Sequence, residues 1–255
     1  MAQWLRYSHQ GKTGFGTLEG ETIKVHTGDM FAAAQPTGET LALGSVKVLT
    51  PTTPTKMIAL WNNFRALATK LGNPDPTVPL YLLKAPNSFL AHGETIRKPA
   101  SYDGKVVYEG ELGIVIGKRA SGVSEADAPN YIFGYTCIND VTAAEVINAD
   151  KTFAQWVRAK SYDTFGVFGP VVATDIDPMK VSIKLVLNGD ERQNYPVADC
   201  FYSPAKLVSL ISQDLTLEPG DVIAIGTSVG VGSMKPGSEV SVTIEGIGTL
   251  ANRYE

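Results

Sequence analysis

Residues 106–117 place two acidic side chains inside an otherwise apolar stretch, VVYEGELGIVIG. The stretch is rich in β-branched residues and ends in glycine, so it predicts a strand. Side chains alternate along a strand, and Glu109 and Glu111 therefore project from one face, on either side of Gly110. Neighbouring carboxylates repel each other unless they are protonated, exposed to water or bridged by a cation. Taken alone, the pair favours a solvated strand edge, because carboxylates on strands are usually solvated. The alternative, a cation site, depends on residues farther along the chain.

The composition argues against several classes of protein. The chain has 255 residues, 44% of them hydrophobic, which is enough for one large domain or a domain with a small appendage. Its net charge is −4 and its 22 Lys and Arg residues form no long runs, which argues against binding to nucleic acid or to an anionic membrane. No apolar segment approaches the ~20 residues needed to span a bilayer, and the N-terminus lacks the features of a signal peptide.

Cysteine and histidine are scarce, which limits the chemistry of any site. Cys137 and Cys200 are too few for a disulfide framework, so we expect a cytoplasmic protein in a reducing compartment. The three histidines, His9, His26 and His92, lie far apart in the sequence. A zinc site built from histidine is therefore not expected, and any metal would be a hard ion held by oxygen ligands.

The order of predicted strands and helices divides the chain near residue 52. Short strands joined by turns fill residues 1–50, and Pro51 and Pro54 then interrupt the pattern. We therefore expect a small N-terminal β subdomain over residues 1–52 and a larger domain over residues 53–255. In the larger domain, strands are predicted at 57–60, 80–86 and 131–140, hairpins at 181–192 and 240–250, and helices at 62–72, 141–148 and 203–212.

Three charged residues occur where predicted strands end or where the pattern fails. Asp140 ends one strand, and as an isolated residue it is best interpreted as the N-cap of the helix predicted after it. Lys84 ends another strand and is expected to be solvated. Residues 155–170 match neither a helical nor a strand period, which is typical of loops that carry function. Lys160 lies there among apolar neighbours, where a charge needs a partner.

A glycine-rich turn, GTSVGVG from Gly226 to Gly232, follows a predicted strand near the C-terminus. It looks superficially like a dinucleotide-binding fingerprint, but its spacing differs and no helix follows it. The turn retains the capacity to present backbone N–H groups and the Thr227 hydroxyl to an anion.

Five segments occur together in one order: YEGEL from Tyr108, GYTCINDVTA from Gly134, RAKSYDTF from Arg158, LEPGDVI from Leu217 and GTSVGVG from Gly226. In this order and approximate spacing they resemble the fumarylacetoacetate hydrolase (FAH) superfamily, over about residues 55–255. The resemblance implies a β-rich α+β fold, with an FAH-type mixed β-roll catalytic domain that is usually a homodimer. It also implies a Mg²⁺ or Mn²⁺ ion held by the residues that match Glu109, Glu111 and Asp140.

The resemblance also assigns expectations to residues around that ion. Lys160 matches a lysine near the metal, and Thr227 matches a threonine that binds a substrate carboxylate. Asn63 and Gly226 lie in matching motifs and are further candidates for substrate contact. The implied substrate is a small 2-oxo acid, which chelates such an ion through a carboxylate oxygen and the adjacent oxo group. The ion then stabilises the enolate that forms when an α-proton, CO₂ or an acyl group leaves, and Lys160 adds positive charge.

One segment departs from the pattern of the hydrolytic members. Those of the short kind typically carry Asn-Tyr-x-x-His-x-x-Glu, whose His–Glu pair activates the attacking water. Here the matching segment is NFRALATK from Asn63, in which Leu67 and Lys70 replace the pair. Neither residue can act as that base. His92 and Lys84 are the remaining candidates, and nothing in the sequence places them near the site.

The departure favours an enzyme that moves protons or releases CO₂ from a short unsaturated 2-oxo dicarboxylate. Such an enzyme would be of the 2-hydroxyhepta-2,4-diene-1,7-dioate isomerase or 5-oxopent-3-ene-1,2,5-tricarboxylate decarboxylase type, in aromatic catabolism. The alternative is hydrolysis of a C–C bond in an acylpyruvate such as fumarylpyruvate. Two further alternatives are a tautomerase of the oxaloacetate type and a binding module without catalysis, and the three acidic residues argue against the last.

Overall fold

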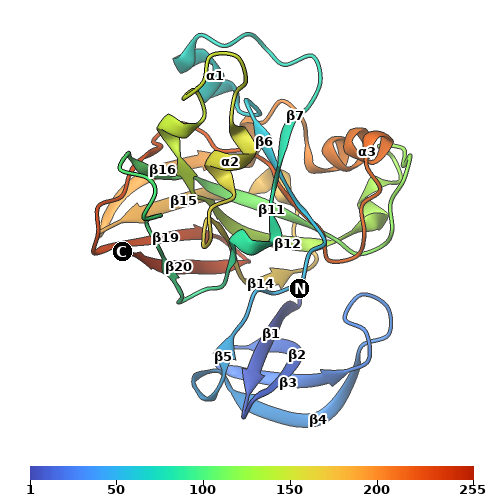
Figure 1. Cartoon of the computed structure of the whole chain (residues 1–255). Helices are drawn as coiled ribbons and strands as arrows, with labels where there is room; N and C mark the ends of the chain where they lie inside the picture. Colours follow the sequence, from blue (N-terminus) through green and yellow to red (C-terminus); the bar gives the residue numbers. More distant parts are fainter.

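The computed structural model describes residues 1–255 and contains twenty strands in three sheets, together with three short α-helices (Figure 1). This is the β-rich α+β architecture expected from the sequence, including the N-terminal β subdomain. No helix in the structure has the length and apolar character needed to cross a membrane.

The N-terminal strands form one end of the largest sheet, which has twelve strands. They are β1 (Gln3–His9), β2 (Lys12–Glu19), β3 (Thr22–Thr27), β4 (Gln35–Ala42) and β5 (Lys47–Val48). In Figure 1 these strands (blue) lie below the other elements. β1 pairs antiparallel with β14 (Gly166–Ala173), where Trp4 lies opposite Val172. The division of the chain near residue 52 stays a proposal, because this pairing places both parts in one sheet.

The rest of the largest sheet carries the acidic residues singled out in the sequence. Next to β14 the order is β12 (Ile132–Asp140), β11 (Gly110–Ile116), β17 (Val222–Ala224), β6 (Met57–Trp61) and β7 (Leu80–Lys84), and β8 (Phe89–Leu90) pairs with β14. Side chains of β11 alternate as predicted. Leu112, Ile114 and Ile116 belong to the largest buried hydrophobic cluster, and Val115 belongs to a second, smaller one.

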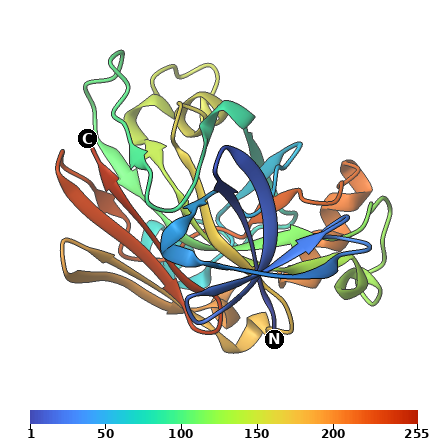
Figure 2. The same ribbon diagram turned by 90° about the horizontal axis from the view of Figure 1, so that it is seen from below.

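A five-stranded sheet packs against the largest sheet and encloses the main hydrophobic core. Its order is β16 (Asp190–Pro196), β15 (Ser182–Leu187), β19 (Ser238–Ile244), β20 (Gly248–Tyr254) and β9 (Thr95–Ile96). Leu185 of β15 and Val242 of β19 join Leu112 of β11 in one buried cluster, which the removal of apolar surface from water stabilises. Figure 2 shows the orange and red strands of this sheet along one side of the molecule.

One end of α1, one end of α3 and the turn between β15 (Ser182–Leu187) and β16 (Asp190–Pro196) form where the sequence predicted them. α1 (Arg65–Leu71) ends at Gly72, whose left-handed backbone (φ 70°) closes the helix. α3 (Pro204–Asp214) begins after Ser203, whose hydroxyl accepts the Lys206 N–H at 3.3 Å. The turn between β15 and β16 has positive φ at both Asn188 and Gly189, as the Asn-Gly pair predicts. Short 3₁₀ helices lie at Leu43–Ser45, Pro86–Ser88, Ala128–Tyr131, Ala144–Val146, Pro178–Lys180 and Val197–Asp199.

Two predictions of local structure around the acidic residues are wrong. The α-helix predicted at 141–148 does not form, because pairing of β13 (Thr142–Ala143) with β10 (Val106–Tyr108) outweighs the helical pattern and leaves only the 3₁₀ helix Ala144–Val146. The predicted strand at 106–117 is two strands, since β10 lies in a three-stranded sheet with β13 and β18 (Gly232–Ser233) while β11 lies in the largest sheet. Glu109 occupies the break between them.

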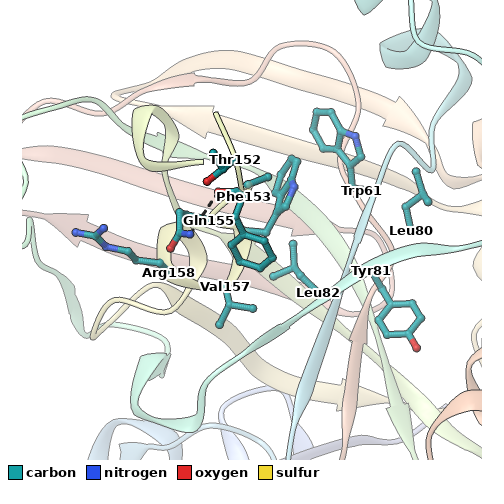
Figure 3. Close-up of a pocket in the computed structure, with 11 residues that line it drawn as sticks. Trp61, Leu80, Tyr81, Leu82, Thr152, Phe153, Gln155, Val157 and Arg158 are labelled. Carbon is teal, nitrogen blue, oxygen red and sulfur yellow. Dashed lines mark hydrogen bonds between the residues drawn. The ribbon is translucent and has the colours of Figure 1, made fainter. Parts of the chain in front are cut away.

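Residues 155–170 also differ from the loop that was expected. They contain α2 (Trp156–Lys160) and the beginning of β14. A cavity of about 610 Å³ lies beside α2, β6 and β7 and is lined mostly by apolar side chains, among them Trp61, Leu82 and Trp156 (Figure 3). Its volume is typical of small-molecule sites. Two of the elements that line it, β7 and α2, end in Lys84 and Lys160.

Candidate active site

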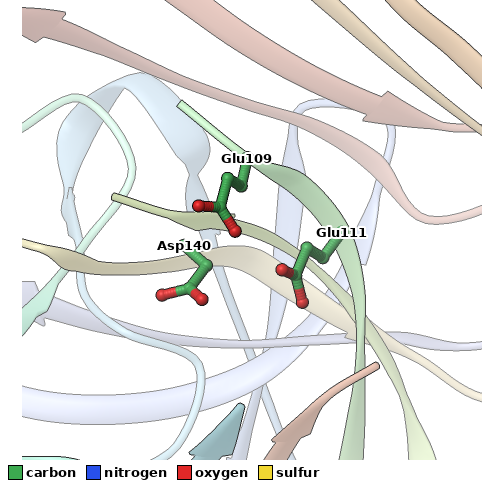
Figure 4. Close-up of side chains that lie close together, drawn as sticks. All are labelled: Glu109, Glu111 and Asp140. Carbon is green, nitrogen blue, oxygen red and sulfur yellow. The ribbon is translucent and has the colours of Figure 1, made fainter. Parts of the chain in front are cut away.

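Three carboxylates converge where β10, β11 and β12 meet (Figure 4). Asp140 is the last residue of β12, Glu111 is the second residue of β11, and Glu109 lies just before it. One oxygen from each side chain lies within 4.8 Å of the others. The Asp140 N–H donates to the Glu109 carbonyl oxygen at 2.8 Å, which ties the two backbones together. Glu111 and Asp140 are fully buried, so the solvated strand edge is not what the chain forms.

Two buried lysines point at the same carboxylates. Lys84 Nζ donates to Asp140 Oδ1 and, at 3.3 Å, to the Val141 carbonyl oxygen. Lys160 Nζ donates to Asp140 Oδ2 and, at 2.8 Å, to Glu109 Oε2. Lys84 is only 1% exposed, so its expected solvated position is wrong. The N-cap interpretation of Asp140 is also wrong, because its carboxylate accepts both ammonium groups and strand β13, not a helix, follows it.

The charges at this site do not balance, since three carboxylates face two ammonium groups. Burial raises the pKa of Glu109 and raises the pKa of Glu111 well above its usual range. Burial acts in the same direction on Asp140, but the ammonium groups of Lys160 and Lys84 hold its pKa below the usual value. Burial opposes the charge on Lys160, and the Asp140 and Glu109 carboxylates nevertheless raise its pKa. Glu111 is therefore the member of the cluster whose charge is least compensated.

Glu111 also provides the observation that tests whether a metal ion fits here. Its Oε2 accepts the Gly226 N–H at 2.8 Å, whereas its Oε1 is buried and has no hydrogen-bond partner. An unpaired buried carboxylate oxygen is costly. A hard divalent cation satisfies such an oxygen, and carboxylates are the ligands that Mg²⁺ and Mn²⁺ prefer. Glu109, Glu111 and Asp140 therefore fit the ion that the sequence resemblance implies.

The glycine-rich turn lies against Glu111, a contact that the sequence analysis did not predict. Gly226 has a φ of 96°, a conformation that favours glycine, and its N–H meets Glu111. The Thr227 hydroxyl donates to the Gly110 carbonyl oxygen at 3.1 Å, next to both glutamates in sequence. Asn63 reaches this region indirectly, because its amide donates to the Ile225 carbonyl oxygen at 2.7 Å and thereby holds the residue before Gly226.

The structure does not bring every predicted residue to the site. His92 Nδ1 accepts the Ala251 N–H at 3.1 Å, and none of its hydrogen bonds reaches a carboxylate. Burial lowers the His92 pKa. Leu67 and Lys70 lie on α1, where Leu67 is half-buried and Lys70 is exposed. The role of His92 as a base therefore stays a prediction that this geometry does not favour.

Three polar residues at the site were missed by the sequence analysis. Thr142 Oγ1 donates to Glu109 Oε1 at 2.9 Å. Gln193 and Tyr195 of β16 both hydrogen-bond to Gly110, between the two glutamates. The signal for Thr142 was its place in the DVTA motif, but β16 carries no local pattern that points to a site. Its contacts with Gly110 join positions more than eighty residues apart.

Comparison with known proteins decides the family. Residues 56–255 match the family described as fumarylacetoacetate (FAA) hydrolase C-terminal, and residues 2–51 match the family described as Rv2993c-like, N-terminal. The chain belongs to the fumarylacetoacetate hydrolase family. The resemblance carried by the five sequence motifs is thereby confirmed.

Named members of the FAH family resemble this chain over most of its length. Oxaloacetate tautomerase YisK of Bacillus subtilis is 32% identical over 92% of this chain and 83% of its own. The crystal structure of 2-hydroxyhepta-2,4-diene-1,7-dioate isomerase from Mycobacterium marinum is 34% identical, covers 100% of this chain and 98% of its own, and has a TM-score of 0.91. The crystal structure of maleylpyruvate hydrolase from Sphingobium sp. SYK-6, solved with manganese(II) and pyruvate, is 26% identical in sequence. It covers 99% of this chain and 98% of its own, with a TM-score of 0.79.

Proposed function

We propose that this member of the FAH family is a Mg²⁺- or Mn²⁺-dependent enzyme that acts on a short unsaturated 2-oxo dicarboxylate. The reaction is isomerisation or decarboxylation through an enolate. The observation that carries the proposal is the buried group of Glu109, Glu111 and Asp140, with an unpaired oxygen on Glu111 and no His–Glu pair on α1.

In this proposal the metal ion would bind the 2-oxo acid and stabilise negative charge on it. Glu109, Glu111 and Asp140 would hold the ion, which would polarise the carboxylate and oxo oxygens of a 2-oxo acid and stabilise negative charge on them. The solved maleylpyruvate hydrolase contains manganese(II) and pyruvate, itself a 2-oxo acid, which supports this choice of metal and substrate class.

The residues of the chain supply fixed charge, proton donors and exclusion of water. Lys160, a residue that is 3% exposed, places its positive charge beside two of the carboxylates and lowers the cost of negative charge on a substrate bound there. Lys84 Nζ holds Asp140 from the other side and keeps that carboxylate in one orientation. The Thr227 hydroxyl, in the turn beside Glu111, is the donor that would meet a substrate carboxylate. Burial of these groups strengthens each electrostatic contact.

The alternative is hydrolysis of an acylpyruvate, and the solved maleylpyruvate hydrolase is the observation that favours it. Hydrolysis requires a base for the attacking water, which is typically worth ~10²–10⁴ in rate. Leu67 has no basic group, and Lys70 lies exposed on α1. The isomerase and the tautomerase are also more similar to the chain, at 34% and 32% identity, than the hydrolase at 26%. These facts support proton transfer or loss of CO₂ over hydrolysis.

The proposal is tested by assaying metal-free protein before and after addition of Mg²⁺ or Mn²⁺. Oxaloacetate reports tautomerisation and decarboxylation, 2-hydroxyhepta-2,4-dienedioate reports isomerisation, and fumarylpyruvate reports hydrolysis. We expect metal-dependent turnover of one or both of the first two and little of the third. Turnover that is equal with metal and with chelator would overturn the metal dependence, and binding of the substrates without turnover would identify a binding module.

A further inference from the structure

Gly110, which separates the two glutamates, has both of its backbone polar groups held by side chains of another sheet. Gln193 Oε1 accepts the Gly110 N–H at 2.9 Å, and the Tyr195 hydroxyl donates to the Gly110 carbonyl oxygen at 2.5 Å. Residues two apart on a strand share a face, so β16 presents both side chains to Gly110. β17 pairs with β11 only from Gly113 onward. Gly110 lies opposite Asn139 of β12, but on the β17 side, side chains take the place of a strand partner.

The other end of Gln193 reaches the glycine-rich turn. Its Nε2 donates to Thr227 Oγ1 at 2.9 Å and to the Ser228 carbonyl oxygen at 3.1 Å. Gln193 is 1% exposed, and only one orientation of its amide fits, since the Gly110 N–H needs an oxygen and the Ser228 carbonyl needs an N–H. One side chain thus joins the strand that carries the metal ligands to the turn that carries Thr227.

This contact also decides what the Thr227 hydroxyl can do. An amide NH₂ group only donates, so Thr227 Oγ1 accepts from Gln193 and must direct its own proton elsewhere. That proton goes to the Gly110 carbonyl oxygen at 3.1 Å, which already accepts the Tyr195 hydroxyl. The Thr227 proton can therefore turn to an external acceptor, and the Gly110 carbonyl oxygen keeps a partner.

We propose that Gln193 is a positioning residue with two effects, one at each end of its amide. It fixes the Gly110 peptide from which Glu109 and Glu111 extend, and it makes the Thr227 hydroxyl a donor directed at a carboxylate of the ligand. This inference rests on the proposed function, because it assigns Gln193 to the same metal and 2-oxo acid site. A purely structural role would lower stability and leave the affinities for metal and ligand unchanged.

The test compares Gln193→Met with Gln213→Met. Methionine keeps the length of the side chain and removes its amide. Gln213 is the control for loss of an amide away from the site, because its Nε2 donates to the carbonyl oxygens of Val123 and Ser209 at α3, where its side chain is exposed. The affinity for Mn²⁺ is measured by titration of the metal-free protein, and the affinity for oxalate, a stable analogue of a 2-oxo acid, by titration of the Mn²⁺-loaded protein.

We expect Gln193→Met to weaken Mn²⁺ binding by about 10- to 100-fold, as loss of groups that orient metal ligands typically does. Oxalate binding should weaken further, and Gln213→Met should change neither affinity. Thr227→Val should weaken oxalate binding about 10-fold or more and Mn²⁺ binding much less than Gln193→Met, since Tyr195 still holds the Gly110 carbonyl oxygen.

Two failures are distinguishable. Absence of Mn²⁺ binding in the unsubstituted protein would overturn the proposed function and this inference with it. Normal Mn²⁺ binding in that protein, with the same affinity in Gln193→Met, would overturn the inference alone.

Should Gln193→Met fail to fold, Gln193→Glu carries the test, because it keeps the acceptor for the Gly110 N–H and loses the donor to Thr227. It should weaken oxalate binding more than Mn²⁺ binding, and the reverse order would contradict the proposal.

Discussion

At the scale of single residues, Asp140 and Glu111 show how burial converts ordinary acids into a site. Asp140 is a residue type that often caps helices, and it lies where a cap was expected. Its two carboxylate oxygens nevertheless accept hydrogen bonds from the ammonium groups of Lys84 on β7 and Lys160 on α2. Glu111 has one oxygen held by a backbone N–H and one with no partner. Neither condition is visible in a local pattern, because every partner comes from a distant part of the chain.

Glu111→Ala tests the assignment of the metal ligands. An ion at 100 times its Kd stabilises the folded state by about 2.7 kcal/mol, or a rise in Tm of roughly 5–10 °C for a chain of this size. We expect this metal-dependent rise in the unsubstituted protein and its loss in Glu111→Ala. Glu191→Ala is the control, because Glu191 is an exposed acid that pairs only with Lys184 and with the Asn194 amide. An unchanged response to metal in Glu111→Ala would remove Glu111 from the site.

At the scale of elements, the sequence predicted the strands and helix ends that neighbouring residues determine. It missed the strand pairing and the burial that residues far along the chain determine. Alternation located β12 and the hairpin of β19 and β20, and cap signals located the C-terminal end of α1 and the N-terminal end of α3. The segment after Asp140 was predicted as a helix, and pairing of β13 with β10 overrides that pattern. Lys160, Glu109 and Asp140 were found through motifs, whereas no motif contains Lys84, and its buried position follows only from packing.

A contact between two loops gives a prediction at this scale. The Tyr102 hydroxyl donates to Glu145 Oε2, which also accepts the Lys105 N–H at 2.9 Å and so joins residues 99–105 to the turn after β13. Tyr102→Phe should cost about 1 kcal/mol in the free energy of unfolding at pH 7. Tyr162→Phe is the control, because the Tyr162 ring stacks on Tyr102 but its hydroxyl makes no hydrogen bond in the structure. Equal losses in the two variants, measured by urea unfolding, would show that the cost comes from removing any hydroxyl here and not from the hydrogen bond to Glu145.

The same contact predicts a dependence on pH. The hydrogen bond from Tyr102 holds the pKa of Glu145 below its ordinary value of 4.5. A carboxyl whose pKa is lower in the folded state stabilises the fold above the unfolded pKa and loses that contribution as pH falls through the folded pKa. The difference in unfolding free energy between the native protein and Tyr102→Phe should therefore shrink as pH falls below 4.5. A difference that stays constant from pH 7 to pH 3 would contradict this assignment.

At the scale of the whole molecule, the oligomeric state is a proposal. We propose a homodimer, because the resemblance to the FAH superfamily implies one, while the acidic and evenly charged composition gives no independent reason for it. Exposed apolar side chains, including Leu80, Phe153 and Val157 at the cavity beside α2, are surfaces that a second copy would cover. Light scattering at micromolar concentration should give twice the 27.3 kDa of the chain. A mass equal to one chain across that range would refute the dimer.

The central claim is that the site forms an enolate but lacks the base for hydrolysis. The most direct measurement is NMR of two reactions on one preparation, with Mg²⁺ and with chelator: exchange of the C3 protons of a 2-oxo acid in D₂O, and cleavage of an acylpyruvate. We predict that metal-dependent exchange is at least ~100-fold faster than cleavage, because the missing base is worth typically ~10²–10⁴ in rate. Efficient metal-dependent cleavage that survives substitution of both His92 and Lys84 would show that another base is present and would contradict the account.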